Sequence, residues 1–233
     1  MKATGSEFAN RAVIFGFVIG VPFALYSLDH ENATAILANW LGPKLHVDAD
    51  LLARVLFAFA ALVLAIAALI RTWASSYLNA GVVYASAVKT ASLVADGPYR
   101  RVRNPLYLAN ILMAIAMGSM MSRTGLAVCV AAMIVFCYRL IFREETELSA
   151  SQGERYDAYC SLAPRLWPAL RPRVPSTARQ PAWTAGFKAE SWYWGFAAAL
   201  LAFAITLKLE VFFIVTAASV GSFWISSAMR ESK

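Results

Sequence analysis

Residues 97–107 read Gly97-Pro98-Tyr99-Arg100-Arg101-Val102-Arg103-Asn104-Pro105-Leu106-Tyr107, and this stretch decides how the chain folds. It places three arginines and two prolines directly before an apolar run, residues 106–121. Each proline removes a backbone donor and keeps the residue before it out of the helical region. We therefore predict that residues 97–107 form a stiff, extended, cationic strap at a membrane surface, leading into a membrane-spanning helix. Rigidly held guanidinium groups suit recognition of a carboxylate or phosphate, although the arginines could instead only orient the next helix.

The composition indicates an integral membrane protein. The chain has 233 residues, of which 60% are hydrophobic and 15% are charged, whereas a soluble domain carries about 25% charged residues. Apolar runs long enough to cross a bilayer core of about 30 Å recur along the chain. Six of them are expected to be transmembrane helices, at about residues 11–28, 51–70, 105–122, 125–142, 191–207 and 210–228. The predicted fold is an all-α membrane protein with about six transmembrane helices, in which the last two pairs form tight hairpins.

The placement of basic residues predicts the orientation of these helices. With both termini inside, the inner segments hold seventeen lysines and arginines and the outer segments hold four. Because cytoplasmic loops carry an excess of Lys and Arg, we expect an inner or plasma membrane protein with both termini in the cytosol. The net charge of +7 is interpreted as an orientation signal and an attraction to membrane lipids, and not as a sign of nucleic-acid binding. The first run is expected to be an uncleaved span, since charged residues separate it from any small-residue cleavage site.

Cysteine and histidine usage excludes several kinds of chemistry. Cys129 and Cys137 lie in the fourth apolar run and Cys160 lies on the inner side, so no extracytoplasmic disulfide framework is available. The two histidines, His30 and His46, lack metal-ligand spacing, and no dinucleotide fingerprint or phosphate loop is present. An enzyme built on this chain is therefore expected to work without a protein-bound metal and without histidine.

Two polar segments on the predicted inner side can carry chemistry. The first, residues 71–104, contains Trp73, Tyr77 and Tyr84 at the spacing of an interfacial helix and ends in the strap. The second, residues 143–190, is predicted to begin as a helix that runs to about residue 160. It then holds five of the nine prolines, which indicates an irregular loop able to wrap back over a site at the membrane face.

Glu144 and Glu145 form a diacidic helix end directly after the fourth predicted span. Carboxylates at the inner end of a helix oppose both the helix dipole and the positive-inside bias. They could simply be solvated and paired with Arg139 or Arg143, but surface pairs of this kind contribute only ~0–1 kcal/mol. We therefore interpret the strap and the diacidic helix end as two halves of a site for a zwitterion, such as an amino-acid group with a carboxylate and an ammonium.

These motifs together resemble a known family. They comprise Gly97-Pro98-Tyr99-Arg100, Arg103-Asn104-Pro105, Tyr107, Glu144-Glu145-x-x-Leu148, Gly153, Tyr156, Tyr159, Pro164-Arg165 and Pro168. The pattern is similar to that of the membrane methyltransferases, which include isoprenylcysteine carboxyl methyltransferases and phospholipid N-methyltransferases. The match covers about residues 50–170, and two motifs in the same order make it specific. The clear departure is Asn104, where the family usually has a histidine; asparagine donates and accepts hydrogen bonds but cannot titrate.

The resemblance implies S-adenosylmethionine as methyl donor, bound in a pocket at the cytosolic face. Carried over position by position, the catalytic residues would be Arg103, Asn104, Glu145 and Arg165. The same resemblance assigns cofactor contacts to Tyr99, Arg103, Asn104, Pro105, Tyr107, Glu144 and Glu145. It divides the chain into a first helix and outer loop (1–50), a methyltransferase core (51–170), a proline-rich cytosolic linker (171–190) and a C-terminal transmembrane hairpin (191–233).

The resemblance favours a methyltransferase acting on a lipid-like or small lipophilic substrate that enters from the bilayer, in the manner of isoprenylcysteine carboxyl methyltransferases. A sulfonium methyl is already activated, so alignment of the reacting atoms can supply ~7–11 kcal/mol of barrier reduction. A phospholipid amine is the first alternative acceptor. An NADPH-dependent membrane reductase is a second alternative, for which the chain is short, and a non-enzymatic membrane module or transporter is a third. The methyl acceptor and the oligomeric state stay open.

Overall fold

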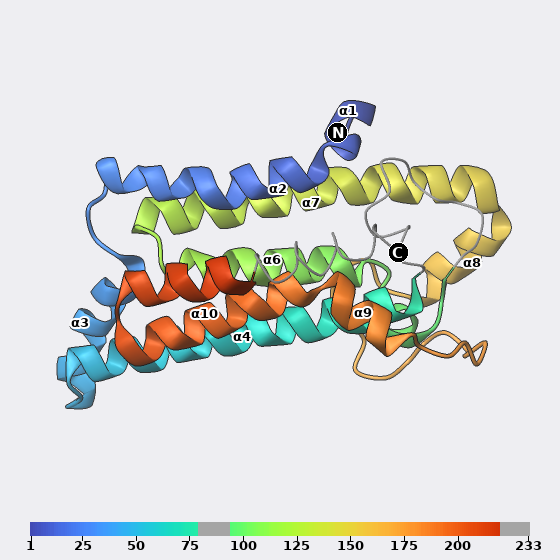
Figure 1. The fold of residues 1–233 in the computed structure, drawn as a ribbon. Coiled ribbons are helices and arrows are strands. Elements are labelled where there is room, and N and C mark those ends of the chain that lie inside the picture. The colour runs from blue at the N-terminus through green and yellow to red at the C-terminus, as the bar shows by residue number, and fades with distance from the viewer. Residues whose placement is uncertain (79–93, 220–233) are drawn as a thin grey trace, which may run out of the picture. The chain divides into compact units, whose positions relative to one another are not determined.

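The computed structural model describes residues 1–78 and 94–219, and this part of the chain is built of helices without a strand (Figure 1). The α-helices are α1 (Gly5–Ala9), α2 (Arg11–Gly20), α3 (Ala33–Leu45), α4 (Ala49–Tyr77), α6 (Pro105–Gly118), α7 (Arg123–Gln152), α8 (Glu154–Leu162), α9 (Trp183–Ala189) and α10 (Ser191–Thr206). The 3₁₀ helices are η1 (Val21–Ser27) and η2 (Gly97–Arg100), and a further helix covers Leu209–Ser219. The predicted all-α class is confirmed for the described residues.

Among the described helices, α4 and α7 are long and apolar enough to cross a membrane, judged by length and composition alone. They have 29 and 30 residues, whereas a span needs about 20. The other predicted spans coincide with shorter apolar helices at Arg11–Ser27, Pro105–Gly118, Ser191–Thr206 and Leu209–Ser219. Residues 220–228 of the last predicted span lie outside the described residues. The apolar helices thus stand where they were expected, while six crossings stay a prediction.

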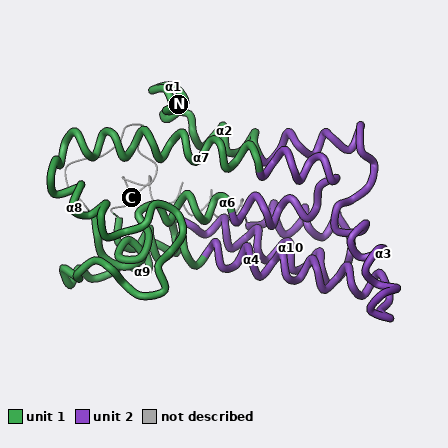
Figure 2. Tube along the Cα trace, turned by 180° about the vertical axis from the view of Figure 1, so that it is seen from behind, with its two compact units in different colours: residues 1–18, 69–111, 131–189 green, residues 19–68, 112–130, 190–233 purple. Residues whose placement is uncertain are grey.

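The chain forms two compact units, each assembled from three separate stretches of sequence (Figure 2). Unit 1 consists of residues 1–18, 69–111 and 131–189, and unit 2 consists of residues 19–68, 112–130 and 190–233. The strap and the diacidic helix end both belong to unit 1, so the candidate site can be described within a single unit.

In unit 1, α2 lies along α7, and the N-terminus is anchored to the same helix (Figure 1). The rings of Phe15 and Phe136 meet edge to face with 5.1 Å between their centroids. The backbone N–H of Ala3 donates to the carbonyl of Arg139 over 3.0 Å. Glu7 pairs with the guanidinium of Arg139, with 2.7 Å between Oε2 and Nη2. These contacts hold the first residues of the chain against the middle of α7.

Gly153 ends α7 and turns the chain back into α8. Its φ of +51° lies in the left-handed region, where glycine has no steric penalty. The turn allows α8 to bury Tyr156 and Tyr159 in a cluster with Ala163 and Val174. The predicted helix that runs to about residue 160 therefore exists as two helices with a glycine hinge between them.

Trp73 and Tyr77 belong to the last turns of α4 and do not form the separate interfacial helix that was predicted. The helix continues past its apolar part because Arg71, although charged, is buried and donates to Oδ1 of Asn110 over 2.8 Å. Tyr84, the third aromatic residue of the predicted helix, lies outside the described residues. Helix α4 is therefore longer than the span predicted at 51–70.

Unit 2 is organised by polar side chains that cap its helices. Asp29 accepts bonds from the guanidinium of Arg123 over 3.0 Å and from the backbone N–H of Thr124 over 3.1 Å, at the start of α7. These donors lower the pKa of Asp29 to about 2. Asn32 caps α3 by accepting the N–H of Ala35 over 2.9 Å. The segment expected to be an outer loop therefore contains a capped helix, α3.

Candidate active site

The strap begins with the 3₁₀ turn η2 and is not extended as predicted. Gly97 has a φ of +61°, and a Cβ at this position would overlap the ring of Tyr77, so the turn requires glycine. The N–H of Arg101 donates to the carbonyl of Pro98 over 2.9 Å, and Pro105 then occupies the first position of α6. The extended strap was a wrong prediction because the fixed φ of proline also suits the start of a turn.

Two of the three strap arginines hold the chain that follows α8. Nε of Arg100 donates to the carbonyl of Val174 over 2.8 Å, and Nη1 of Arg101 donates to the carbonyl of Leu170. Both guanidinium groups therefore bind backbone oxygens of the proline-rich segment. Of the three strap arginines, Arg103 is therefore the one left as a candidate for binding an anion.

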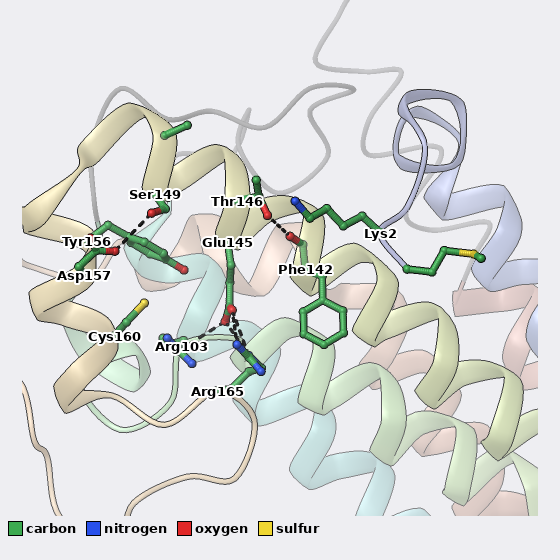
Figure 3. Close-up of a pocket in the computed structure, with 12 residues that line it drawn as sticks. Lys2, Arg103, Phe142, Glu145, Thr146, Ser149, Tyr156, Asp157, Cys160 and Arg165 are labelled. Atoms are coloured by element: carbon green, nitrogen blue, oxygen red, sulfur yellow. Dashed lines mark hydrogen bonds and ion pairs between the residues drawn. The ribbon is translucent and has the colours of Figure 1, made fainter.

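Glu145 lies at the centre of a polar cluster that joins the strap to the diacidic helix end (Figure 3). Nη2 of Arg165 lies 2.9 Å from Oε2 of Glu145, and Nε of Arg165 lies 3.0 Å from the same oxygen. Nε of Arg103 lies 3.5 Å from Oε1. Nδ2 of Asn104 donates to Oε1 over 3.3 Å and to the carbonyl of Arg165 over 3.0 Å. The two motifs that the sequence singled out thus meet in space.

The members of the cluster differ in exposure. The side chains of Arg103 and Glu145 are each 11% exposed, whereas that of Arg165 is 42% exposed. Nε of Arg103 is buried and makes no hydrogen bond within the described part of the chain. The hydrogen bond to Glu145 holds the pKa of Arg165 above its ordinary value. Arg103 and Glu145 therefore form an inner pair, and Arg165 is the partner that can move into solvent.

The two arginines on the same helix as the diacidic pair bind other carboxylates. Nη2 of Arg139 lies 2.7 Å from Oε2 of Glu7, and Nη2 of Arg143 lies 2.7 Å from Oε1 of Glu147. The alternative interpretation of the diacidic helix end was surface pairing with Arg139 or Arg143. Glu145 does not form such a pair.

A cavity of about 740 Å³ opens beside the cluster (Figure 3). Its walls come from the N-terminus, the strap, α7, α8 and the residues after α8: Met1, Lys2, Arg103, Phe142, Glu145, Thr146, Ser149, Ala150, Tyr156, Asp157, Cys160 and Arg165. The volume falls in the range of small-molecule sites, about 300–1,000 Å³. Three cationic side chains and two carboxylates face it, so the cavity suits a ligand that carries both signs of charge.

Of the residues predicted to be catalytic, Arg103, Glu145 and Arg165 line the cavity. Asn104 is buried and holds Glu145 and the backbone of Arg165 in place without lining it. Tyr99 and Pro105 are buried in the strap, and the carbonyl of Tyr99 accepts a bond from Oη of Tyr159 over 2.8 Å. The cofactor contacts assigned to Tyr99, Asn104 and Pro105 stay predictions.

Tyr107 and Glu144 bind each other away from the cavity walls. Oη of Tyr107 donates to Oε1 of Glu144 over 2.7 Å, which links α6 to α7. Tyr107 is 7% exposed. Because the phenol of Tyr107 is buried, its hydrogen bond to the carboxylate stabilises the helix pair. A cofactor contact for these two residues also stays a prediction.

Tyr107→Phe tests whether the hydroxyl of Tyr107 stabilises the helix pair or contacts the cofactor. Removing the hydroxyl leaves a carboxylate oxygen of Glu144 without its donor, so we expect a loss of about 1–3 kcal/mol in the free energy of unfolding. The affinity for S-adenosylmethionine should stay within twofold of wild type. Thermal unfolding and calorimetry on the same detergent-purified sample measure both quantities. A tenfold loss of affinity with unchanged stability would instead favour the cofactor contact that the family pattern implies.

Several cavity residues were not predicted from the sequence. Asp157 and Ser149 face each other, with Oγ of Ser149 donating to Oδ1 of Asp157 over 3.3 Å. Tyr156 belongs to the motif that carries the resemblance but was assigned no role. Lys2 gave no local signal, because it reaches the cavity only through the attachment of the N-terminus to α7 (Figure 3).

Comparison with known proteins bears directly on this site. Residues 55–155 match the model of the phospholipid methyltransferase family. The resemblance to the membrane methyltransferases is thereby confirmed. The matched region contains the strap and both residues of the diacidic helix end, and it ends before Arg165. The methyltransferase match therefore includes Arg103 and Glu145 of the cluster and leaves out the more exposed Arg165.

Two curated relatives align with parts of the chain. The nickel-cobalt-cadmium resistance protein NccN of Alcaligenes xylosoxydans xylosoxydans is 31% identical over 88 residues, which are 38% of this chain and 41% of the relative. The cobalt-zinc-cadmium resistance protein CzcN of Cupriavidus metallidurans is 26% identical over 137 residues, 59% of this chain and 60% of the relative. The chain thus spans less than two thirds of either relative. No solved structure matches the chain significantly.

Proposed function

We propose that this protein is an S-adenosylmethionine-dependent methyltransferase that acts on a lipophilic substrate at the cytosolic face of a membrane. The family match supports methyl transfer, and the apolar helices support a membrane location. The observation that carries the proposal is the cluster of Arg103, Glu145 and Arg165 in the cavity wall. It offers a carboxylate and two guanidinium groups to a zwitterionic ligand.

The cavity residues fit S-adenosylmethionine, which when bound supplies a methyl group already activated on a sulfonium. Its amino-acid end carries a carboxylate and an ammonium. The guanidinium of Arg103 lines the cavity, and its contact with Glu145 is a long one of 3.5 Å, so Arg103 can also bind a ligand carboxylate. Glu145 would hold the ammonium, and the partly exposed Arg165 can turn from Glu145 to the ligand at little cost. Asn104 would act as a positioning residue that keeps Glu145 in place.

Tyr156 would contribute a hydrogen-bond donor to the cavity wall. Burial, and the nearby carboxylate of Glu145, raise the pKa of this phenol well above its usual range. The hydroxyl therefore stays protonated at neutral pH and does not serve as a base. Within the cluster, the carboxylate of Glu145 is paired with the two guanidinium groups of Arg103 and Arg165.

A carboxylate is the first candidate for the methyl acceptor. It is nucleophilic without losing a proton, so it needs no base from the cavity wall. The excess of cationic side chains around the cavity also attracts an anion. A lipophilic carboxylic acid, as in an isoprenylcysteine, therefore suits the site.

A phospholipid amine is the second candidate, and two observations favour it. The family match is to phospholipid methyltransferases. The carboxylate of Asp157 lines the cavity and can accept a proton from an ammonium group before methylation. An amine acceptor would therefore rely on Asp157, whereas a carboxylate acceptor would not.

Transfer of tritiated methyl from S-adenosylmethionine to a total membrane lipid extract tests the proposal and separates the two candidates. Wild-type protein in proteoliposomes is expected to give organic-soluble radioactivity. Mild base releases the label as methanol from a methyl ester but leaves an N-methyl group in place. Label that base converts into volatile methanol supports the carboxylate, and label that stays non-volatile after base and is lost in Asp157→Asn supports the amine.

We further propose that the cavity faces the cytosol, because seventeen of the basic residues lie on the predicted inner side against four on the outer side. Cysteines introduced at Gln180 and Asp50, both exposed, report the two sides in a Cys160→Ala background. A membrane-impermeant maleimide should label position 50 in intact cells and position 180 only after permeabilisation. The reverse labelling pattern would place the cavity on the outer side of the membrane, where cytosolic S-adenosylmethionine does not reach it.

A further inference from the structure

The segment that follows α8, residues 163–189, exposes large apolar side chains and is here called the surface segment. Trp167 is 78% exposed and Leu170 is 96% exposed. Trp183 and Phe187 of α9 are each 47% exposed. Exposed groups of this size on one short segment mark a surface that meets a membrane or a partner.

The exposure is not the result of a loose chain. The N–H of Ala169 donates to the carbonyl of Arg101 over 2.9 Å, and the N–H of Arg173 donates to the carbonyl of Arg100 over 2.8 Å. Val174, directly after Arg173, is buried with the two tyrosines of α8. The backbone on both sides of Leu170 is therefore held in place while its side chain points outward.

Two contacts fix the depth of the surface segment relative to α4, a candidate membrane span. The N–H of Ala182 donates to the carbonyl of Ser76 over 2.8 Å. A Cβ at Gly186 would lie 2.6 Å from the carbonyl of Thr72, so α9 touches the backbone of α4 there. At 1.5 Å per residue, Thr72 and Ser76 lie about 3 Å and about 9 Å beyond the apolar run that ends at residue 70, so the two contacts bracket the layer next to the hydrocarbon core. The polar headgroup layer beyond the hydrocarbon core is about 5–8 Å thick. The segment is thus attached at headgroup depth.

The charge of the surface segment has one sign. Residues 158–189 contain no aspartate or glutamate, and they hold Arg165, Arg171, Arg173, Arg179 and Lys188. Arg171 and Arg173 flank Pro172 and are exposed next to Leu170 in the sequence. Tryptophan and leucine beside exposed arginines are the side chains that settle at the boundary of an anionic leaflet.

We propose that the surface segment docks on an anionic phospholipid leaflet, with Trp167 and Leu170 inserted at the boundary of headgroups and acyl chains and with Arg171 and Arg173 at lipid phosphates. The proposal does not depend on methyl transfer, since it concerns a surface outside the cavity. Its consequence for the cavity is geometric. Arg165 stands two residues before Trp167, so docking brings the rim of the cavity to the depth of lipid headgroups.

Depth-dependent quenching of a fluorophore tests the docking. A Leu170→Cys variant in a Cys160→Ala background carries one reactive thiol, because Cys129 and Cys137 are buried. It is labelled with an environment-sensitive dye and placed in nanodiscs containing a lipid with a spin label near the headgroup. The control is Ser151→Cys in the same background, which is exposed at the end of α7. We expect at least threefold stronger quenching at position 170 than at position 151.

The charge requirement is tested in the same samples. Replacing a third of the phosphatidylcholine by phosphatidylglycerol should increase quenching at position 170, and Arg171→Gln with Arg173→Gln should abolish that increase. Equal quenching at positions 170 and 151 would overturn the proposal. It would also be overturned if position 170 were shielded from aqueous iodide without quenching by the lipid, because a protein contact would then cover the segment.

Discussion

Glu145→Gln is expected to lower the affinity for S-adenosylmethionine by about ten- to one hundredfold. The carboxylate that would hold the ligand ammonium disappears, and a lost charge-assisted hydrogen bond costs about 1.5–3 kcal/mol. The substitution also leaves Arg103, whose side chain is 11% exposed, without its inner partner. Calorimetric titration of the detergent-purified variant measures the affinity, and its thermal unfolding shows whether the fold is retained.

Glu147→Gln is the matched control for this variant. Glu147 lies on the same helix and forms an ion pair of the same type with Arg143, but it is absent from the cavity walls. Its loss should leave the affinity within about twofold of wild type, since a partly exposed pair contributes only ~0–1 kcal/mol. Equal losses in both variants would mean that any charge change on α7 lowers the affinity. Unchanged affinity in the folded Glu145→Gln variant would remove Glu145 from the site.

Asn104→Leu is expected to weaken S-adenosylmethionine binding by about tenfold or more. The leucine keeps the volume of the side chain but removes the donor that serves both Oε1 of Glu145 and the carbonyl of Arg165. Unpaired buried acceptors cost about 1–3 kcal/mol. The cluster should then lose its fixed geometry even though Asn104 does not line the cavity.

Asn104→His distinguishes positioning from simple packing. Histidine is the residue usual in the family and keeps one N–H donor for Glu145 or for the carbonyl of Arg165, so more of the affinity should be retained than in Asn104→Leu. Parallel titrations of the leucine and histidine variants give the comparison. Asn104→Leu that binds as tightly as wild type would make Asn104 a structural residue of the strap and remove it from the functional set.

The contact between the strap and the diacidic helix end could be predicted from the sequence, because a membrane helix does not ordinarily need either motif beside it. Three arginines before an apolar run, and two glutamates directly after the fourth predicted span, are costly without a partner. Arg103 and Glu145 indeed form the inner pair. The sequence did not reveal that Arg100 and Arg101 bind backbone carbonyls, because such acceptors are present at every residue and leave no pattern.

Other features of the site depend on contacts between distant parts of the chain. Lys2 reaches the cavity because the N-terminus is attached to α7 by Ala3 and Glu7, and neither attachment has a local signature. Glu144 and Glu145 are adjacent in sequence, yet a helix turns successive side chains by about 100°, so only one of them faces the cavity. The family pattern alone therefore assigned both glutamates to the cofactor site, although the helix points them in different directions.

Titration of the detergent-purified protein with S-adenosylmethionine and, separately, with NADPH tests the central claim most directly. We expect saturable binding of S-adenosylmethionine in the wild type and in Glu147→Gln, a shift of at least tenfold in Glu145→Gln, and no binding of NADPH. Binding of NADPH with none of S-adenosylmethionine would contradict the account and favour the reductase alternative. S-adenosylmethionine binding that is unchanged in the folded Glu145→Gln variant would contradict the proposed location of the site.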